Sequence, residues 1–168
     1  MNHNPLFDFT VDKAANTIFI RREFNARLSL VWDAFTNPEI LDQWGAPAPW
    51  IARTKDMNFE VGGRRLYAMV SPEGQEHWSI QEYTSITPTS NFKMLTNFAD
   101  KEGNITSGFK SSENNLDFSE ANGITTVNIS IRYAAPEVLE MMISKGFREG
   151  YSMTMNNLEN LLTSLSKA

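Results

Sequence analysis

The stretch from Pro136 to Ser166 constrains the fold most, because it is one long helical pattern that follows a chain of strand patterns. Pro136 suits the first turn of a helix, where its missing N–H is not needed. Further along, apolar residues recur at steps of three or four and therefore line one face of a helix. They are Phe147, Tyr151, Met155, Leu158, Leu162 and Leu165. This face has to be buried, and the preceding strands provide the surface that can bury it.

Two glycines interrupt the helical pattern. Gly146 and Gly150 lie four residues apart, and each costs roughly 1 kcal/mol relative to Ala in a helix interior. We expect a continuous or mildly kinked helix, in which the missing side chains admit a neighbouring backbone or a ligand. The alternative is a break into two helices at the glycines.

Alternating apolar and polar residues predict strands over most of the remaining chain. The clearest strand follows Asn122-Gly123, a dipeptide that favours the tight turn of a hairpin. One face of this strand is apolar and the other polar, as in an antiparallel sheet that covers a core on one side. Its apolar face consists of Val127, Ile129, Ile131 and Tyr133. The other predicted strands are 7–12, 17–24, 54–61, 64–70, 75–85, 92–98 and 116–121, and residues 104–113 are expected to be an irregular connection.

Two short helices are predicted after the first long strand. Residues 28–35 have helical spacing, and Asn37-Pro38-Glu39 then supplies a cap, a fixed φ and an acid for the start of a second helix. This order of elements predicts an α+β fold in which a curved antiparallel sheet wraps around one long C-terminal helix. We expect one domain over residues 1–168, with residues 1–5 disordered.

Composition limits the classes of partner and compartment. The net charge of −5 and the pI near 5.1 argue against nucleic acid or an anionic membrane as the main partner. No stretch approaches the roughly 20 apolar residues of a membrane span, and the N-terminus has no signal-peptide pattern. The chain has no cysteine, which excludes disulfides and thiolate metal sites and fits a reducing compartment. We therefore expect a cytoplasmic protein.

The sequence offers few residues for catalysis or metal binding. His3 lies in the expected disordered terminus, so His77 has no second histidine with which to bind a metal. We expect a structural or surface role for His77; the alternative is a proton-transfer group in a pocket. Gly62-Gly63-Arg64-Arg65 lacks the spacing of a phosphate-binding loop and is better explained as a bend. No Gly-x-Ser-x-Gly motif occurs. We therefore assign no catalytic residue, metal or cofactor.

A sheet wrapped around one helix leaves a gap in which a mostly apolar ligand can bind. The chain supplies many aromatic and methionine side chains for the walls of this gap, and a fully packed core is the alternative. The candidate cavity residues are Trp44, Trp50, Phe59, Tyr67, Met69, Trp78, Tyr83, Phe98, Met142, Phe147, Tyr151 and Met155. The predicted strand 64–70 has apolar side chains on both of its faces. The pattern therefore leaves open whether Tyr67 and Met69 or Leu66 and Ala68 face inward.

Short motifs along nearly the whole chain are similar to those of one known superfamily. They are Arg22-Glu23-Phe24, Val31-Trp32-Asp33-Ala34-Phe35-Thr36-Asn37-Pro38-Glu39, Leu41-Asp42-Gln43-Trp44, Pro47-Ala48-Pro49-Trp50, Gly62-Gly63, Pro72-Glu73-Gly74, His77-Trp78, Phe98-Ala99-Asp100, Gly103-Asn104, Thr125-Thr126-Val127 and Lys145-Gly146-Phe147-Arg148-Glu149-Gly150. The chain resembles START-like proteins of the SRPBCC superfamily, in the branch related to the activator of the heat-shock-protein ATPase. The resemblance implies a helix-grip fold, with a cavity between the sheet and the C-terminal helix.

The chain departs from this branch at one position, because Trp44-Gly45 stands where two adjacent tryptophans are usual. Loss of the second ring would enlarge or open one end of the cavity, or leave Trp50 to fill it. The superfamily includes lipid carriers, cyclases, hydrolases and chaperone cofactors, so the fold alone does not define the function.

Three functions follow as hypotheses. The first is non-enzymatic binding of a small hydrophobic or amphipathic molecule in the cavity. The second, suggested by the resemblance, is an interaction module for a chaperone or another protein. The third is an enzyme with its reacting groups inside the cavity. A monomer and a homodimer are both compatible with the pattern.

Overall fold

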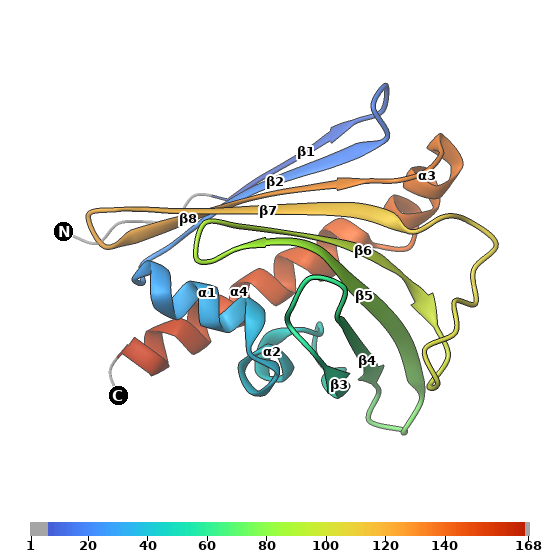
Figure 1. Ribbon diagram of the computed structural model, residues 1–168, viewed down its shortest axis with the longest axis horizontal. Coiled ribbons are helices and arrows are strands. Elements are labelled where there is room, and N and C mark those ends of the chain that lie inside the picture. Colours follow the sequence, from blue (N-terminus) through green and yellow to red (C-terminus); the bar gives the residue numbers. More distant parts are fainter. Residues whose placement is uncertain (1–6, 167–168) are drawn as a thin grey trace.

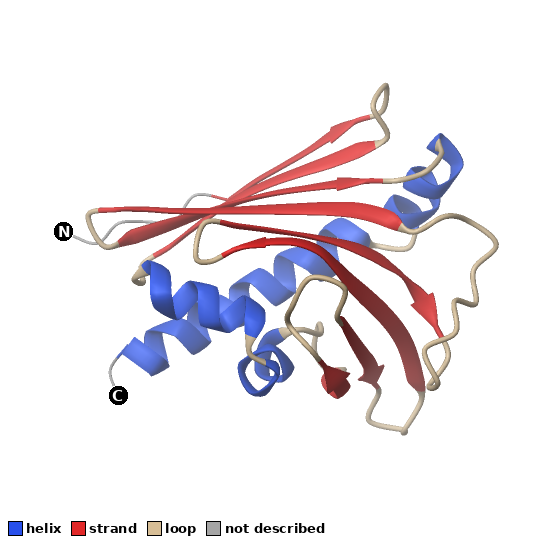
Figure 2. Ribbon diagram, in the orientation of Figure 1, coloured by secondary structure: helices blue, strands red, loops and turns tan. Residues whose placement is uncertain are grey.

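The computed structural model describes residues 7–166 and contains one antiparallel sheet and four helices (Figures 1 and 2). The terminus for which disorder was expected, residues 1–5, lies outside the described residues. The strands are β1 (Phe7–Asp12), β2 (Thr17–Phe24), β3 (Ile51–Met57), β4 (Arg64–Val70), β5 (Glu76–Thr87), β6 (Asn91–Ala99), β7 (Ser112–Ala121) and β8 (Ile124–Arg132). The helices are α1 (Leu28–Thr36), α2 (Pro38–Trp44), α3 (Pro136–Ser144) and α4 (Phe147–Ser166).

The sheet is a meander to which one hairpin is added. Its strand order is β1-β2-β8-β7-β6-β5-β4-β3, and every neighbouring pair is antiparallel. The turn between β7 and β8 has Asn122 at φ 54° and Gly123 at φ 78°, as a two-residue hairpin turn requires. The hairpin predicted at this dipeptide is therefore confirmed.

The sheet curves over α4, and α1 and α2 lie on the same side of the sheet (Figure 1). The predicted inward face of β8 is buried at Val127, Ile129 and Ile131, and α4 buries Leu158 and Leu162 in the same core. Each fully buried side chain of this size stabilises the fold by about 1.5–3 kcal/mol. The α+β helix-grip architecture and the two short helices after the first long strand are confirmed.

The C-terminal helical region is broken, and the expectation of a continuous helix was wrong. Gly146 has φ +85°, a left-handed conformation that ends α3 and that side chains with a Cβ rarely adopt. A second helix starts immediately, because the Gly150 N–H donates to the Gly146 carbonyl at 3.0 Å. Gly150 itself lies inside α4, where an added Cβ would be 3.9 Å from Pro47 Cγ.

Several strand boundaries also differ from the prediction. β7 begins at Ser112 rather than at residue 116, so the end of the expected irregular connection 104–113 is strand, and the ends of β5 and β6 differ by one or two residues. The third strand covers Ile51–Met57 rather than residues 54–61, because Asn58 begins a turn in which its carbonyl accepts a hydrogen bond from the Glu60 N–H at 3.0 Å. The predicted bend at Gly62 and Gly63 is present, and both glycines form backbone hydrogen bonds with Tyr83. Among the described helices, none is both long and apolar enough to cross a membrane.

Candidate functional site

A cavity of about 370 Å³ lies between the concave face of the sheet and α4. Strands β4 to β8 provide one wall, and α4 with the segment around Trp44 to Pro47 provides the other. The volume falls within the roughly 300–1,000 Å³ typical of small-molecule sites.

Eight of the predicted cavity residues line this space, and four do not. Those in the wall are Trp44, Tyr67, Met69, Tyr83, Phe98, Met142, Phe147 and Tyr151. Those outside it are Trp50, Phe59, Trp78 and Met155. The cavity therefore uses aromatic and methionine side chains from α2, β4, β5, β6, α3 and α4.

Two of the four residues outside the wall pack elsewhere in the core. Phe59 lies against Tyr83, with ring centroids 4.8 Å apart, and contacts Phe92 at 5.4 Å. It therefore supports two rings that line the cavity. Met155 belongs to α4, and its side chain is fully buried in the hydrophobic core.

The two tryptophans outside the wall lie near β5. Trp50 contacts the His77 ring edge-to-face at 5.0 Å, and His77 is exposed and does not line the cavity. Trp78 packs against a small cluster on the convex face of the sheet, which includes Leu66 and Ile80. Trp78 and Ser79 are consecutive residues of β5, so their side chains point to opposite faces of the sheet. Ser79 lines the cavity, and Trp78 therefore points away from it.

The orientation of β4 explains why its pattern was ambiguous. Arg65, Tyr67 and Met69 line the cavity, whereas Leu66 and Ala68 are fully buried on the opposite face. Because both faces of this strand are covered, both parities carry apolar residues, and alternation alone cannot identify the inward face.

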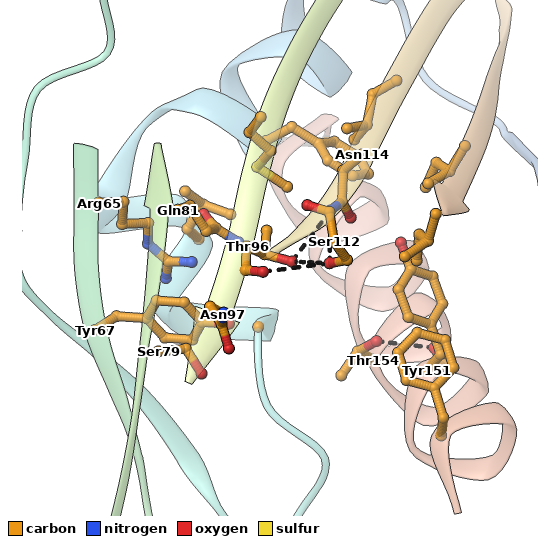
Figure 3. A pocket seen from close by; sticks show the side chains of 18 of the residues that line it. Arg65, Tyr67, Ser79, Gln81, Thr96, Asn97, Ser112, Asn114, Tyr151 and Thr154 are labelled. Atoms are coloured by element: carbon orange, nitrogen blue, oxygen red, sulfur yellow. Dashed lines mark hydrogen bonds between the residues drawn. The ribbon is translucent and has the colours of Figure 1, made fainter. Parts of the chain in front are cut away.

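Part of the polar wall forms its own hydrogen-bond network. The hydroxyls of Thr96 on β6 and Ser112 on β7 are 2.5 Å apart, and Asn114 Nδ2 donates to Thr96 Oγ1 at 3.1 Å (Figure 3). On α4, Thr154 Oγ1 donates to the Tyr151 carbonyl at 2.8 Å. These groups form hydrogen bonds within the protein, with Thr96, Ser112 and Asn114 together on the strands and Thr154 on α4 (Figure 3).

A second set of polar side chains in the wall has no hydrogen-bond partner among the described residues. They are Tyr67, Ser79, Gln81, Tyr83, Tyr133 and Tyr151. Tyr83 and Tyr133 line the cavity although only 2% and 6% of their surface is exposed. Burial raises the pKa of Tyr83, Tyr133 and Tyr151, which keeps the phenols uncharged at neutral pH.

Arg65 is the only charged side chain in the wall among the described residues. It is 3% exposed, its Nη2 lies 3.2 Å from Asp42 Oδ1, and its guanidinium carbon lies 3.9 Å from the centre of the Tyr67 ring. Its Nε donates to Thr54 Oγ1 at 3.1 Å. From the sequence, Arg65 was interpreted only as part of a bend. Arg65, Tyr67 and Met69 are alternate residues of one strand and therefore lie on the same face. This spacing was the signal from which Arg65 could have been predicted to line the cavity.

The described residues provide little for acid–base or metal chemistry. No aspartate, glutamate or histidine lines the cavity in the described part of the chain, and within residues 7–166 no group of three or more such residues could bind a metal ion. The cavity therefore presents neutral hydroxyl and amide groups and one ion-paired guanidinium within apolar walls.

Comparisons with known proteins identify the family of this chain and find its fold in solved structures. A sequence model of the family described as "Activator of Hsp90 ATPase homolog 1-like protein" matches residues 25–163. The chain belongs to this family, which lies in the START-like, SRPBCC superfamily. A search of curated proteins found no significant match.

Solved structures share the fold over almost the whole chain. Protein Ms6760 from Mycobacterium smegmatis is 28% identical, with a TM-score of 0.86 over 95% of this chain and 97% of that one. A protein from Staphylococcus epidermidis is 29% identical, with a TM-score of 0.82 over 92% and 94%. A protein from Arthrobacter aurescens, at 23% identity and a TM-score of 0.87 over 94% and 91%, shares the fold.

Proposed function

We propose that the protein binds a small amphipathic molecule, mostly apolar in surface, in the cavity between the sheet and α4, without changing it chemically. The observation that carries this proposal is the cavity of about 370 Å³, whose mostly apolar wall includes Tyr83 and Tyr133. A ligand that places a polar group beside their hydroxyls forms hydrogen bonds with them, while its apolar body fills the rest of the cavity.

The size of the cavity limits the affinity that apolar contact alone can supply. A ligand that buries about 300 Å² of apolar surface gains roughly 7 kcal/mol before the costs of association. These costs amount to several kcal/mol, so apolar contact alone gives binding between micromolar and millimolar. Each well-made hydrogen bond to the polar wall adds about 0.5–1.5 kcal/mol.

The proposal is tested with the neutral fluorescent probe N-phenylnaphthylamine. Ser79 lines the cavity and has no side-chain partner in the described chain, so Ser79→Leu fills the cavity without breaking a hydrogen bond. We expect this variant to lose most of the probe's fluorescence enhancement. The matched control is Ser119→Leu, which makes the same change at an exposed position of β7. Equal enhancement in both variants and the wild type would place the probe outside the cavity and refute the proposal.

The two alternatives have less support. Exposed apolar side chains, which a protein-interaction module would gather in one patch, are placed on different elements, including Phe19 on β2, Ile51 on β3 and Met153 on α4. For an enzyme, the described wall supplies neutral phenols and Arg65 as its titratable groups. Failure of the probe to bind, together with a change in the ATPase rate of the host's chaperone, would favour the interaction module.

A further inference from the structure

We propose that the cavity selects uncharged ligands with a hydroxyl or carbonyl group, because Asp42 neutralises Arg65 before any ligand enters. This inference rests on the proposed function and adds the chemical class of the ligand. Arg65 is the one charged residue in the described wall, and Asp42, which is not part of the wall, lies behind it.

The position of the Asp42 carboxylate is fixed by three donors. Arg65 donates to Oδ1, Thr54 Oγ1 donates to Oδ1 at 2.6 Å, and the Thr54 backbone N–H donates to Oδ2 at 2.9 Å. Asp42 belongs to α2 and Thr54 to β3, so the ion pair is held by contacts between two elements. A carboxylate anchored in this way is not displaced easily, and a second anion would have to share Arg65 with it.

The charge balance makes an anionic ligand unfavourable. Arg65 and Asp42 together carry no net charge, so a bound carboxylate would leave one uncompensated negative charge beside apolar walls. An ion without a compensating partner in such surroundings loses more hydration free energy than it regains. The partial exposure of Asp42, at 29%, moderates this penalty without removing it.

The same groups suit an uncharged polar head. Arginine has five N–H donors, and the bonds to Asp42 and Thr54 use two of those on Arg65. Figure 3 shows Tyr67, Ser79 and Gln81 grouped with Arg65 on one side of the cavity, opposite Tyr151. A hydroxyl at this side can both accept and donate hydrogen bonds and a carbonyl can accept them, while the apolar body of the ligand extends along the remaining wall.

The test uses two probes of ten carbons each, 1-decanol with an uncharged hydroxyl head and decanoate with a carboxylate head. Each competes with N-phenylnaphthylamine at neutral pH and below micelle-forming concentration. For the wild type we expect decanol to bind at least about tenfold more tightly, which corresponds to about 1.4 kcal/mol. In Asp42→Asn the charge of Arg65 is no longer compensated. We expect decanoate to gain at least about tenfold relative to decanol in this variant.

Control variants separate local from global charge. Asp56→Asn makes the same change in net charge, but Asp56 pairs with the exposed Arg64, so the preference for decanol should stay as in the wild type. The double variant Asp42→Asn/Arg65→Gln removes both charges and should again prefer decanol. It also keeps the test open if Asp42→Asn fails to fold.

The outcomes distinguish this inference from the proposed function. If the neutral probe does not bind the wild type, the proposed function is refuted. If decanoate binds the wild type as tightly as decanol, the cavity is a ligand site but the inference is wrong. An equal gain of decanoate in Asp42→Asn and Asp56→Asn would also overturn it, because the effect would then come from net charge.

Discussion

Alanine substitution at the two glycines of the C-terminal region should change stability in opposite directions. Gly150 lies inside α4, where replacing Gly by Ala gains roughly 1 kcal/mol. The new Cβ meets Pro47 Cγ at 3.9 Å, an ordinary van der Waals contact. Gly146 has φ +85°, where a Cβ costs about 1–2 kcal/mol, although the nearest atom is 3.8 Å away. The two variants should therefore differ by about 2–3 kcal/mol in the free energy of unfolding.

The assay is thermal and denaturant unfolding of both variants and the wild type. For a chain of this size, 1 kcal/mol shifts the unfolding midpoint by about 2–4 °C, so the midpoints should lie roughly 4–12 °C apart. Stabilisation by Gly146→Ala would show that the region is one continuous helix. Destabilisation by Gly150→Ala would show that the contact with Pro47 has no room for a methyl group.

Three further changes test other parts of the account. Tyr83→Phe removes a hydroxyl that forms no hydrogen bond with the described residues, so stability should change by less than about 1 kcal/mol while decanol binding weakens. Trp44→Phe should destabilise the fold by about 1–3 kcal/mol, because the indole N–H donates to the buried Ala34 carbonyl at 2.9 Å. Arg22→Met removes the cation that opposes the burial-raised pKa of Glu159, whose Oε2 lies 3.9 Å from Arg22 Nη2. With that pKa raised further, the variant's loss of stability should grow as the pH rises from about 4.3, the unfolded value.

Each of these predictions has a result that contradicts it. Unchanged decanol affinity in Tyr83→Phe would remove that hydroxyl from the ligand site. Wild-type stability in Trp44→Phe would mean that the Ala34 carbonyl finds another donor. For Arg22→Met, the added change Glu159→Gln should abolish the extra pH dependence, measured by unfolding between pH 5 and pH 8. If the extra pH dependence of stability persists in the double variant, it comes from a titratable group other than Glu159.

Local signals predicted the fold because each was decided by residues close in sequence. Asn122-Gly123 defines its hairpin through two left-handed residues, and Asn37 caps α2 by accepting a hydrogen bond from the Glu39 N–H at 2.9 Å. The break at Gly146 was missed because a glycine in a helical pattern fits both a helix interior and a left-handed stop. The choice between them depends on tertiary packing.

The cavity was harder to predict than the fold because its wall combines side chains from distant elements. Aromatic residues were chosen by type, and this choice also selected Trp78, which faces the convex side of the sheet. Arg65 was missed because its partner Asp42 is 23 positions away and belongs to a helix. Which side chains share a wall depends on the register between strands, and a single sequence does not reveal that register.

The central claim is that the cavity binds a small molecule, and methyl NMR with labelled methionines tests it most directly. Met69, Met94 and Met142 line the cavity, whereas Met153 is exposed on α4 and does not line it. When decanol is added, we expect saturable shifts in the methyl signals of the three lining methionines and none in that of Met153. Unchanged signals from the lining methionines, or shifts confined to Met153, would contradict the account.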